Sequence, residues 1–207
     1  MRNRHSCVAL IIFLCCLLSG TTAFANDKTP AKRILIVYFS RVGSSRSFAG
    51  LDAVASASLP KGNTIVVADM IRERVGGEGF QIVTVQPYPS QYRDTTELAQ
   101  KEQDAAARPR LKTHVVDMKD YDLIFLGYPI WWGSLPMPVC TFLESYDFSG
   151  KTIIPFCTNG GSGLGRSEKD IAALCPRAKL LGGLAVSASG AEGARAEVLA
   201  WLAGLGY

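Results

Sequence analysis

Five predominantly apolar segments, each about as long as a β-strand, are spaced along the chain from residue 33 onward, and the first of them is continuous. The first, with the sequence ILIVYF, is rich in β-branched residues and shows no polar alternation. A strand that is apolar on both faces is typical of a parallel sheet covered by helices on both sides. The predicted strands are Arg33–Ser40, Phe80–Val85, Leu123–Tyr128, Thr152–Thr158 and Leu180–Ser187.

Segments with helical periodicity separate and follow these strands. The first ends at the Gly76-Gly77 pair, a common helix stop, and the second opens with Asp94 and Glu97 at the spacing of a capping box. The alternation of strand and helix predicts an α/β fold, a doubly wound parallel sheet with right-handed crossovers and helices on both faces. The predicted helices are Thr64–Val75, Asp94–Ala107, Pro136–Tyr146, Ser167–Leu174 and Glu192–Leu205.

The first 25 residues have the pattern of a secretory signal peptide. Arg2 and Arg4 form a basic start, Val8–Leu18 is apolar, and Ala23 and Ala25 are small residues in the positions that precede a cleavage site. The alternative, a membrane anchor, is disfavoured because the apolar run has roughly 11 residues where a spanning helix needs about 20. We therefore expect cleavage after Ala25 and export to the periplasm.

The rest of the chain is expected to be a polar linker at 26–32 and one domain at 33–207, which is long enough to bury a full core. Cleavage removes two arginines and no acid, so 20 basic side chains face 18 acidic ones and the net charge is +2. This balance gives no reason to expect a nucleic acid or an anionic membrane surface as a partner. A redox partner, small molecule or protein, is expected instead, and the oligomeric state is left open.

Three cysteines remain after cleavage: Cys140, Cys157 and Cys175. An odd number at wide spacing is neither a disulfide framework nor a metal site. Cys157 lies in an apolar run and is expected to be a buried free thiol. One disulfide between two of the three is the alternative in an oxidising compartment.

Polar and glycine-containing loops follow three of the predicted strands, at the edge where open α/β sheets bind ligands. After the first strand come Ser40-Arg41 and then, directly before a helix, Gly62-Asn63-Thr64. Hydroxyl groups and backbone N–H groups at the start of a helix are typical of an anion site. We interpret these two short segments as one phosphate loop divided by an insertion at about 42–61.

The alternative reading of this region is a helix and loop over 42–62 followed by a strand at 64–68. That strand would leave only about 11 residues before the next one, which is short for a parallel crossover. The spacing therefore favours the divided loop.

The loop after the third strand contains two adjacent tryptophans. Side chains alternate in an extended segment, so Trp131 and Trp132 cannot both point into one core. At least one of them is expected to be exposed or to face a ligand. The residues of this loop are Tyr128, Pro129, Ile130, Trp131, Trp132 and Gly133.

The loop after the fourth strand has four glycines in the eight residues from 158 to 165, which lets a backbone approach a ligand closely. No lysine follows at the spacing of a nucleoside-triphosphate P-loop. The candidate binding residues of this loop are Thr158, Asn159, Gly160, Gly161, Ser162 and Gly163.

Taken in order, the segments ILIVYFSR, GNT, PYPSQY, YDLIFLGYPIWWGSLPMP and IIPFCTNGGSGLG resemble the flavodoxin family across essentially all of 33–207. The resemblance implies a five-stranded sheet in the order 2-1-3-4-5 that binds flavin mononucleotide (FMN) noncovalently. It assigns the phosphate to Ser40, Asn63 and Thr64, with Arg41 and Gly62 beside them. It assigns the isoalloxazine ring to the two later loops, 128–133 and 158–163.

Three functions are compatible with this resemblance. The first is an FMN-dependent oxidoreductase of the NAD(P)H:quinone type that reduces a small acceptor such as a quinone, and the open aromatic loop favours it. The second is a one-electron carrier for a protein partner, although carrier flavodoxins are usually strongly acidic and this chain is not. The third is a binding module that has lost flavin because its phosphate loop is divided. No histidine, cysteine or acid pair lies in the three loops, so no catalytic side chain and no metal ligand is predicted.

Overall fold

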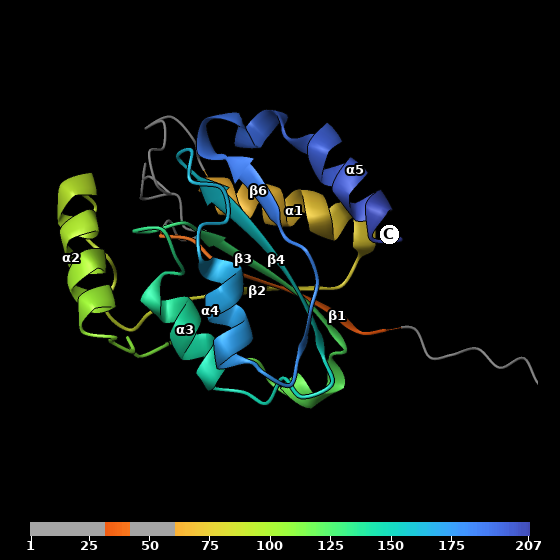
Figure 1. Ribbon diagram of the computed structural model, residues 1–207, viewed down its shortest axis with the longest axis horizontal. Helices are drawn as coiled ribbons and strands as arrows, with labels where there is room; N and C mark the ends of the chain where they lie inside the picture. Colours follow the sequence, from red (N-terminus) through yellow and green to blue (C-terminus); the bar gives the residue numbers. More distant parts are fainter. Residues whose placement is uncertain (1–31, 42–60) are drawn as a thin grey trace, which may run out of the picture. The chain divides into compact units, whose positions relative to one another are not determined.

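A parallel sheet with the strand order β2-β1-β3-β4-β5 forms the centre of the computed structural model, and β6 also pairs with β4 (Figure 1). Every pairing between these strands is parallel. The predicted fold class and the predicted order 2-1-3-4-5 are therefore confirmed. The strands are β1 (Ile34–Phe39), β2 (Glu78–Ile82), β3 (Leu123–Pro129), β4 (Thr152–Asn159), β5 (Lys179–Leu180) and β6 (Leu184–Ser187).

The structure describes residues 32–41 and 61–207. The predicted signal peptide, the linker as far as residue 31 and the predicted insertion from 42 to 60 lie outside the described residues. Within the two described ranges, none of the helices has both the length and the apolar character that a bilayer-spanning segment requires.

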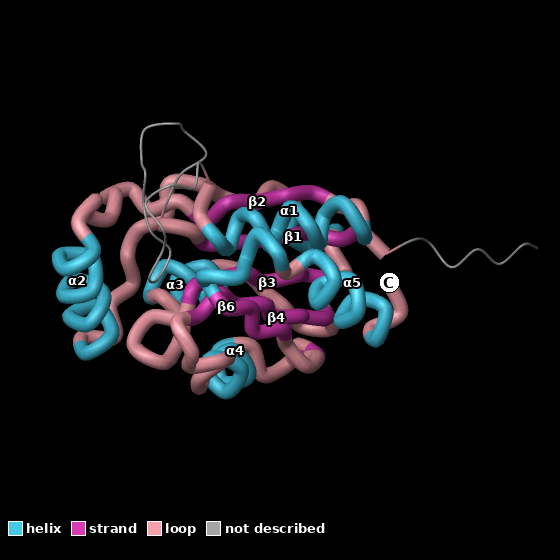
Figure 2. Tube along the Cα trace, turned by 90° about the horizontal axis from the view of Figure 1, so that it is seen from above, coloured by secondary structure: helices cyan, strands magenta, loops and turns pink. Residues whose placement is uncertain are grey.

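The helices lie in two layers, one on each face of the sheet. In Figures 1 and 2, α1 and α5 cover one face, α3 and α4 cover the other, and α2 stands near α3 at the carboxyl ends of the strands. Two short 3₁₀ helices, η1 (Met118–Asp120) and η2 (Ala188–Gly193), complete the described chain. The α-helices are α1 (Asn63–Val75), α2 (Tyr92–Asp104), α3 (Met137–Glu144), α4 (Ser167–Leu174) and α5 (Arg195–Gly204).

The strands are apolar on both faces because the sheet separates two cores. Along β1, Leu35 and Val37 pack in the core beneath α3, whereas Ile36 packs with Val67 of α1 and Val198 of α5. Successive side chains of a strand point to opposite faces, so one uninterrupted apolar run supplies both cores. All seven residues of β3 are buried. The sequence pattern and the layered fold thus have one physical cause.

Helix α1 begins at Asn63 with Gly62 as its N-cap residue. Residues 64–68 are therefore helical, as the divided-loop interpretation requires, and the alternative strand at 64–68 is wrong. Val67 and Ile71 of this helix are fully buried against the sheet.

Strand β2 begins two residues before the predicted Phe80 and ends at Ile82. It pairs with β1 from Leu35↔Glu78 to Phe39↔Ile82. A polar cluster fixes its start, since Glu78 accepts hydrogen bonds from Arg33 and from the Tyr121 hydroxyl. After Ile82 the backbone turns to other partners, and Val85 N donates to the Arg110 carbonyl.

The predicted fifth strand, Leu180–Ser187, is interrupted and forms β5 and β6. Its partner β4 contains Pro155, which has no N–H to contribute to a ladder. Next to it, Gly183 comes so close that a Cβ there would lie 2.9 Å from Pro155 Cγ, and Gly183 N donates to Glu168 on α4 instead. The proline of one strand therefore explains the break in its neighbour.

Helix α2 begins at Tyr92 rather than at Asp94, and the predicted capping box does not form. Its N-cap residue is Gln91, and no side chain bonds to the first turn as a cap. The Glu97 carboxylate is engaged elsewhere, because Arg93 Nε donates to it at 2.8 Å. Glu97 therefore forms an ion pair with Arg93, one helical turn away on the exposed face, and does not cap the helix.

We predict that Gly127→Ala lowers the free energy of unfolding by about 1–3 kcal/mol, the usual cost of overpacking a core. A Cβ at Gly127 would lie 2.2 Å from Cζ of the Phe156 ring, between two neighbouring strands. Urea unfolding followed by circular dichroism measures the effect. The matched control is Gly204→Ala at the end of α5, where nothing lies within 4 Å of the added carbon. Equal midpoints for Gly127→Ala and the unsubstituted protein would contradict the prediction.

Candidate functional site

The three predicted binding loops meet at the carboxyl ends of β1, β3 and β4. The hydroxyl groups of Thr64, at the start of α1, and Thr158, at the end of β4, lie 2.9 Å apart and are buried. The backbone N–H of Ile130 donates to the Thr158 carbonyl at 2.8 Å, which continues the pairing of β3 and β4 into the loops. The predicted phosphate loop and both predicted ring loops are therefore neighbours.

The start of α1 contains a buried amide without a partner. Asn63 is 1% exposed, and neither its Oδ1 nor its Nδ2 makes a hydrogen bond within the part of the chain that the structure describes. Buried polar side chains are nearly always hydrogen-bonded, because leaving one unpaired costs about 1–3 kcal/mol. Together with the N–H groups of a first helical turn, this amide suits an anionic group. Ser40 lies buried at the end of β1, on the same edge of the sheet.

The chain after β3 makes a tight turn over residues 131–134. Trp131 and Ser134 exchange two backbone hydrogen bonds of 3.0 Å each, and the two residues between them, Trp132 and Gly133, both have positive φ angles of 48° and 76°. A two-residue hairpin of type I′ requires this geometry, which glycine and asparagine adopt readily and tryptophan rarely does. Because this conformation is unfavourable for a bulky residue, the surrounding contacts must stabilise it.

The turn is fixed to the start of α4. Arg166 N donates to the Gly133 carbonyl at 2.9 Å, and the Ser134 hydroxyl donates to the Asp170 carboxylate. The backbone of Gly165 lies so close to the Gly133 carbonyl that a Cβ at residue 165 would be 2.3 Å from the carbonyl oxygen. This support was not predicted from the sequence, although the glycines that continue to Gly165 were a signal for it.

The glycine-rich loop after β4 is organised by one side chain. The Oδ1 of Asn159 accepts hydrogen bonds from the N–H groups of Gly161 at 2.8 Å and Gly163 at 3.0 Å, and its Nδ2 donates to the Val186 carbonyl at 3.0 Å. The predicted binding residue Asn159 therefore shapes the loop with its side chain. Gly160, Gly161 and Ser162 at the tip are exposed and open to a ligand.

The two tryptophans have different environments, as predicted. Trp131 is 9% exposed and packs edge-on against Phe39, with ring centroids 5.4 Å apart, and against Tyr88, at 5.1 Å. Trp132 is 51% exposed, and its indole N–H donates to the Thr96 carbonyl of α2 at 2.9 Å. The expectation that at least one of the pair is exposed is confirmed.

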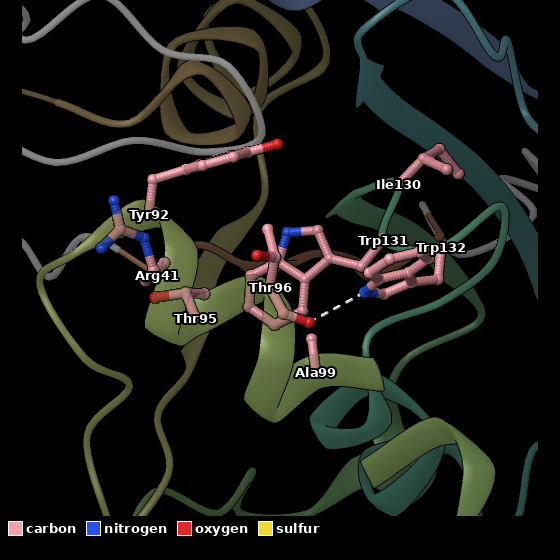
Figure 3. Close-up of a pocket in the computed structure, with 8 residues that line it drawn as sticks. All are labelled: Arg41, Tyr92, Thr95, Thr96, Ala99, Ile130, Trp131 and Trp132. Carbon is pink, nitrogen blue, oxygen red and sulfur yellow. Dashed lines mark hydrogen bonds between the residues drawn. The ribbon is translucent and has the colours of Figure 1, made fainter. Parts of the chain in front are cut away.

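A pocket of about 230 Å³ lies between α2 and the two tryptophans (Figure 3). Arg41 lies at its border, and Nη1 of its guanidinium donates to the Pro89 and Ser90 carbonyls at 2.8 and 2.9 Å. This predicted phosphate residue therefore also braces the segment before α2. The α2 side of the pocket was not predicted from the sequence, and the aromatic segment PYPSQY was the signal that could have shown it. The pocket is lined by Arg41, Tyr92, Thr95, Thr96, Ala99, Ile130, Trp131 and Trp132.

Behind Trp131, the Tyr88 hydroxyl donates to Glu102 at 2.5 Å. Burial raises the pKa of Tyr88, and the bond to Glu102 raises it further. Burial also raises the pKa of the Glu102 carboxyl, against the opposing effect of the tyrosine hydrogen bond. This pair connects the aromatic cluster around Trp131 to α2.

Cys140, Cys157 and Cys175, which lie in the described part of the chain, are free and buried, so the alternative of a disulfide between two of them is not realised in this structure. Burial raises the pKa of the Cys157 thiol to about 12 and that of the Cys140 and Cys175 thiols to about 11. The expectation of a buried free thiol at Cys157 is confirmed. Thiols with such pKa values are poor nucleophiles near neutral pH.

Comparisons with known proteins agree with this architecture. A family model described as flavodoxin matches residues 50–204. A protein from Bacteroides eggerthii assigned as a flavoprotein is 27% identical, with a TM-score of 0.66 over 84% of this chain and 98% of that one. A second protein assigned as a flavoprotein, from Bacteroides uniformis, is 28% identical, with a TM-score of 0.65 over 83% of this chain and 97% of that one.

A flavoprotein from Lactobacillus acidophilus, solved in complex with FMN, shares the fold at 19% identity. Its TM-score is 0.58, over 75% of this chain and 93% of that one. No curated protein matches the chain by sequence.

We predict that Gly165→Ala displaces the 131–134 turn, because the added carbon would overlap the Gly133 carbonyl. The amide of Arg166, whose N–H donates to that carbonyl, should exchange its hydrogen faster, and the free energy of unfolding should fall by more than about 2 kcal/mol. Gly163→Ala is the matched control, since Gly163 has a similar φ of +60° but nothing within 4 Å of a Cβ. Equal losses in the two variants would show that backbone strain alone, and not the contact with Gly133, is responsible.

Proposed function

This chain belongs to the flavodoxin family, and on that premise we propose that it binds FMN and acts as an oxidoreductase that reduces a small acceptor such as a quinone. The observation that carries the proposal is the unpaired, buried Asn63 amide at the start of α1, beside the hydroxyl of Thr64. Family membership and the fold shared with a flavoprotein solved with FMN support the choice of this cofactor.

The residues at the sheet edge fit the parts of FMN. Gly62, Asn63 and Thr64, with Ser40 at the end of β1, would hold the phosphate by amide, hydroxyl and backbone N–H donors. The 131–134 turn and the exposed tip of the loop at 160–162 would border the isoalloxazine ring. Arg41 would contribute a positive charge to this edge of the sheet.

The bound cofactor would supply two electrons and two protons to a quinone, which leaves as a hydroquinone, and a nicotinamide dinucleotide or a protein donor would restore the reduced cofactor. The chain's own part is to hold the flavin and to limit access to it. The buried Trp131 and the half-exposed Trp132 form an apolar wall beside the turn. The net charge of +2 after processing provides little steering toward a protein partner, which favours a small acceptor over a carrier role.

We expect the protein, incubated with FMN and then desalted, to keep a flavin absorbance spectrum and to be reduced in one two-electron step that quinones reoxidise. A stabilised semiquinone on redox titration without quinone turnover would replace the proposal with the one-electron carrier. A colourless protein would refute FMN binding and favour the flavin-free binding module.

Asn63→Ala tests the phosphate site directly. In the flavin-free protein the change removes an unpaired buried amide, so the free energy of unfolding should stay the same or rise slightly. The affinity for FMN, measured by quenching of flavin fluorescence, should fall about tenfold to a hundredfold, the effect of losing a hydrogen bond to a charged group.

Asn159→Ala provides the contrast for that experiment. Its side chain makes three hydrogen bonds within the protein, so its loss should lower the free energy of unfolding by about 2 kcal/mol even without FMN. If Asn63→Ala destabilises the flavin-free protein as much as Asn159→Ala does, the amide of Asn63 has a structural role and the assignment of the phosphate site is wrong.

We also propose that the protein is exported to the periplasm with cleavage after Ala25. The basic, apolar and small-residue segments of the first 25 residues support this proposal. Cell fractionation should recover the protein in the periplasm, and N-terminal sequencing should begin at Asn26. Recovery of a chain that still carries residues 1–25 in the cytoplasm would contradict the proposal.

A further inference from the structure

The pocket between α2 and the two tryptophans, called here the α2 pocket, has one wall outside the three cofactor loops. Ile130, Trp131 and Trp132 form the wall on the side of the sheet. Tyr92, which is 49% exposed, and Ala99 belong to α2 on the opposite side (Figure 3). A flat molecule would thus meet aromatic or apolar surface on both sides.

The indole N–H of Trp131 is a hydrogen-bond donor without a partner. Trp131 is 9% exposed and lines the α2 pocket, and none of the described residues accepts a hydrogen bond from its indole nitrogen. In Figure 3 this nitrogen lies on the edge of the indole that is turned away from Trp132. The nitrogen is not sealed from solvent, so a ligand in the α2 pocket can reach it, and an acceptor oxygen of that ligand would pair the N–H.

The other polar groups of the α2 pocket are already engaged with the backbone. The Thr95 hydroxyl donates to the Pro89 and Gln91 carbonyls, and the Thr96 hydroxyl donates to the Arg93 carbonyl. The pocket therefore offers apolar surface, one unpaired donor and the positive charge of Arg41 at its border. This combination suits a neutral ring that carries carbonyl oxygens.

The size of the α2 pocket restricts the ligand further. Its volume of about 230 Å³ is below the range of roughly 300–1,000 Å³ that is typical of sites for drug-sized ligands. Only a molecule of one or two rings is expected to fit. Ala99, whose small side chain leaves the space beside Trp131 open, sets this limit from the α2 side.

We propose that the α2 pocket binds the acceptor, a quinone of one or two rings whose carbonyl oxygen accepts the hydrogen bond of Trp131 Nε1. The ring lies between Tyr92 and the tryptophans. This inference rests on the proposed function, because it names the site and the class of the acceptor for that reaction.

Duroquinone is a suitable probe, because its ring is fully substituted and does not add to thiols. We expect it to bind to the FMN-loaded protein in isothermal titration calorimetry. Ala99→Leu should weaken binding by at least tenfold, because the larger side chain fills the pocket from α2 while the cofactor loops stay intact. Trp131→Phe keeps the aromatic wall but removes the donor, and should weaken binding about fivefold to tenfold.

Gln100→Leu is the matched control for Ala99→Leu. It introduces the same side chain at the next position of α2, which faces solvent, and should change the affinity less than twofold. Both leucine variants should retain the flavin spectrum of the unsubstituted protein. Unchanged duroquinone affinity in Ala99→Leu, or no binding to the FMN-loaded protein, would overturn the proposal.

The same titration on flavin-free protein separates this inference from the proposed function. If the protein retains no FMN but binds duroquinone, and Ala99→Leu abolishes that binding, the α2 pocket is supported and only the proposed cofactor fails. If the protein retains FMN and does not bind duroquinone, the cofactor proposal stands and the α2 pocket is wrong.

Discussion

The site depends on a turn that is held from two sides. The carbonyl of Gly133 accepts a hydrogen bond from the backbone N–H of Arg166, the N-cap residue of α4, while the indole of Trp132 donates one to Thr96 on α2. Between these anchors, Trp132 has a positive φ angle that an isolated peptide would seldom adopt. Since the conformation is unfavourable locally, the contacts with the two helices must stabilise it. The position of both tryptophans is therefore a property of the packed domain.

The layered fold supplies the frame for this arrangement. Every residue of β3 is buried, so its register is determined by packing on both faces and its end is placed with little freedom. Tyr128 near that end donates a hydrogen bond to Ser167 on α4 at 2.9 Å, which joins the strand to the helix that also holds the turn. Gly127 permits the Phe156 ring of β4 to lie against the backbone of β3. A small residue at one point of the sheet thus supports the alignment of the two loops beyond it.

Much of this could be predicted from the sequence, because uninterrupted apolar runs determine strands that are buried on both faces. The strand order, the helix that begins at Asn63 and the separate environments of the two tryptophans followed from periodicity, spacing and the flavodoxin resemblance. The interruption between β5 and β6 did not, since it arises from Pro155 on a neighbouring strand that is distant in sequence. The capping box was wrong for a similar reason, because the ion pair of Arg93 with Glu97 competes with the cap. Local patterns predicted elements well, and contacts between elements decided their ends.

Within the candidate site, residue type alone did not distinguish binding groups from supporting groups. Asn63 and Asn159 were both predicted to bind the cofactor, yet the side chain of Asn159 makes three hydrogen bonds within the protein and that of Asn63 makes none. Among the described residues, the amide of Asn63 is buried without a partner in the phosphate loop, and the indole N–H of Trp131 donates to no described residue and lies in the α2 pocket. A folded domain rarely leaves such groups unpaired. Their separate positions are what a cofactor and an acceptor, bound side by side at one edge of the sheet, would require.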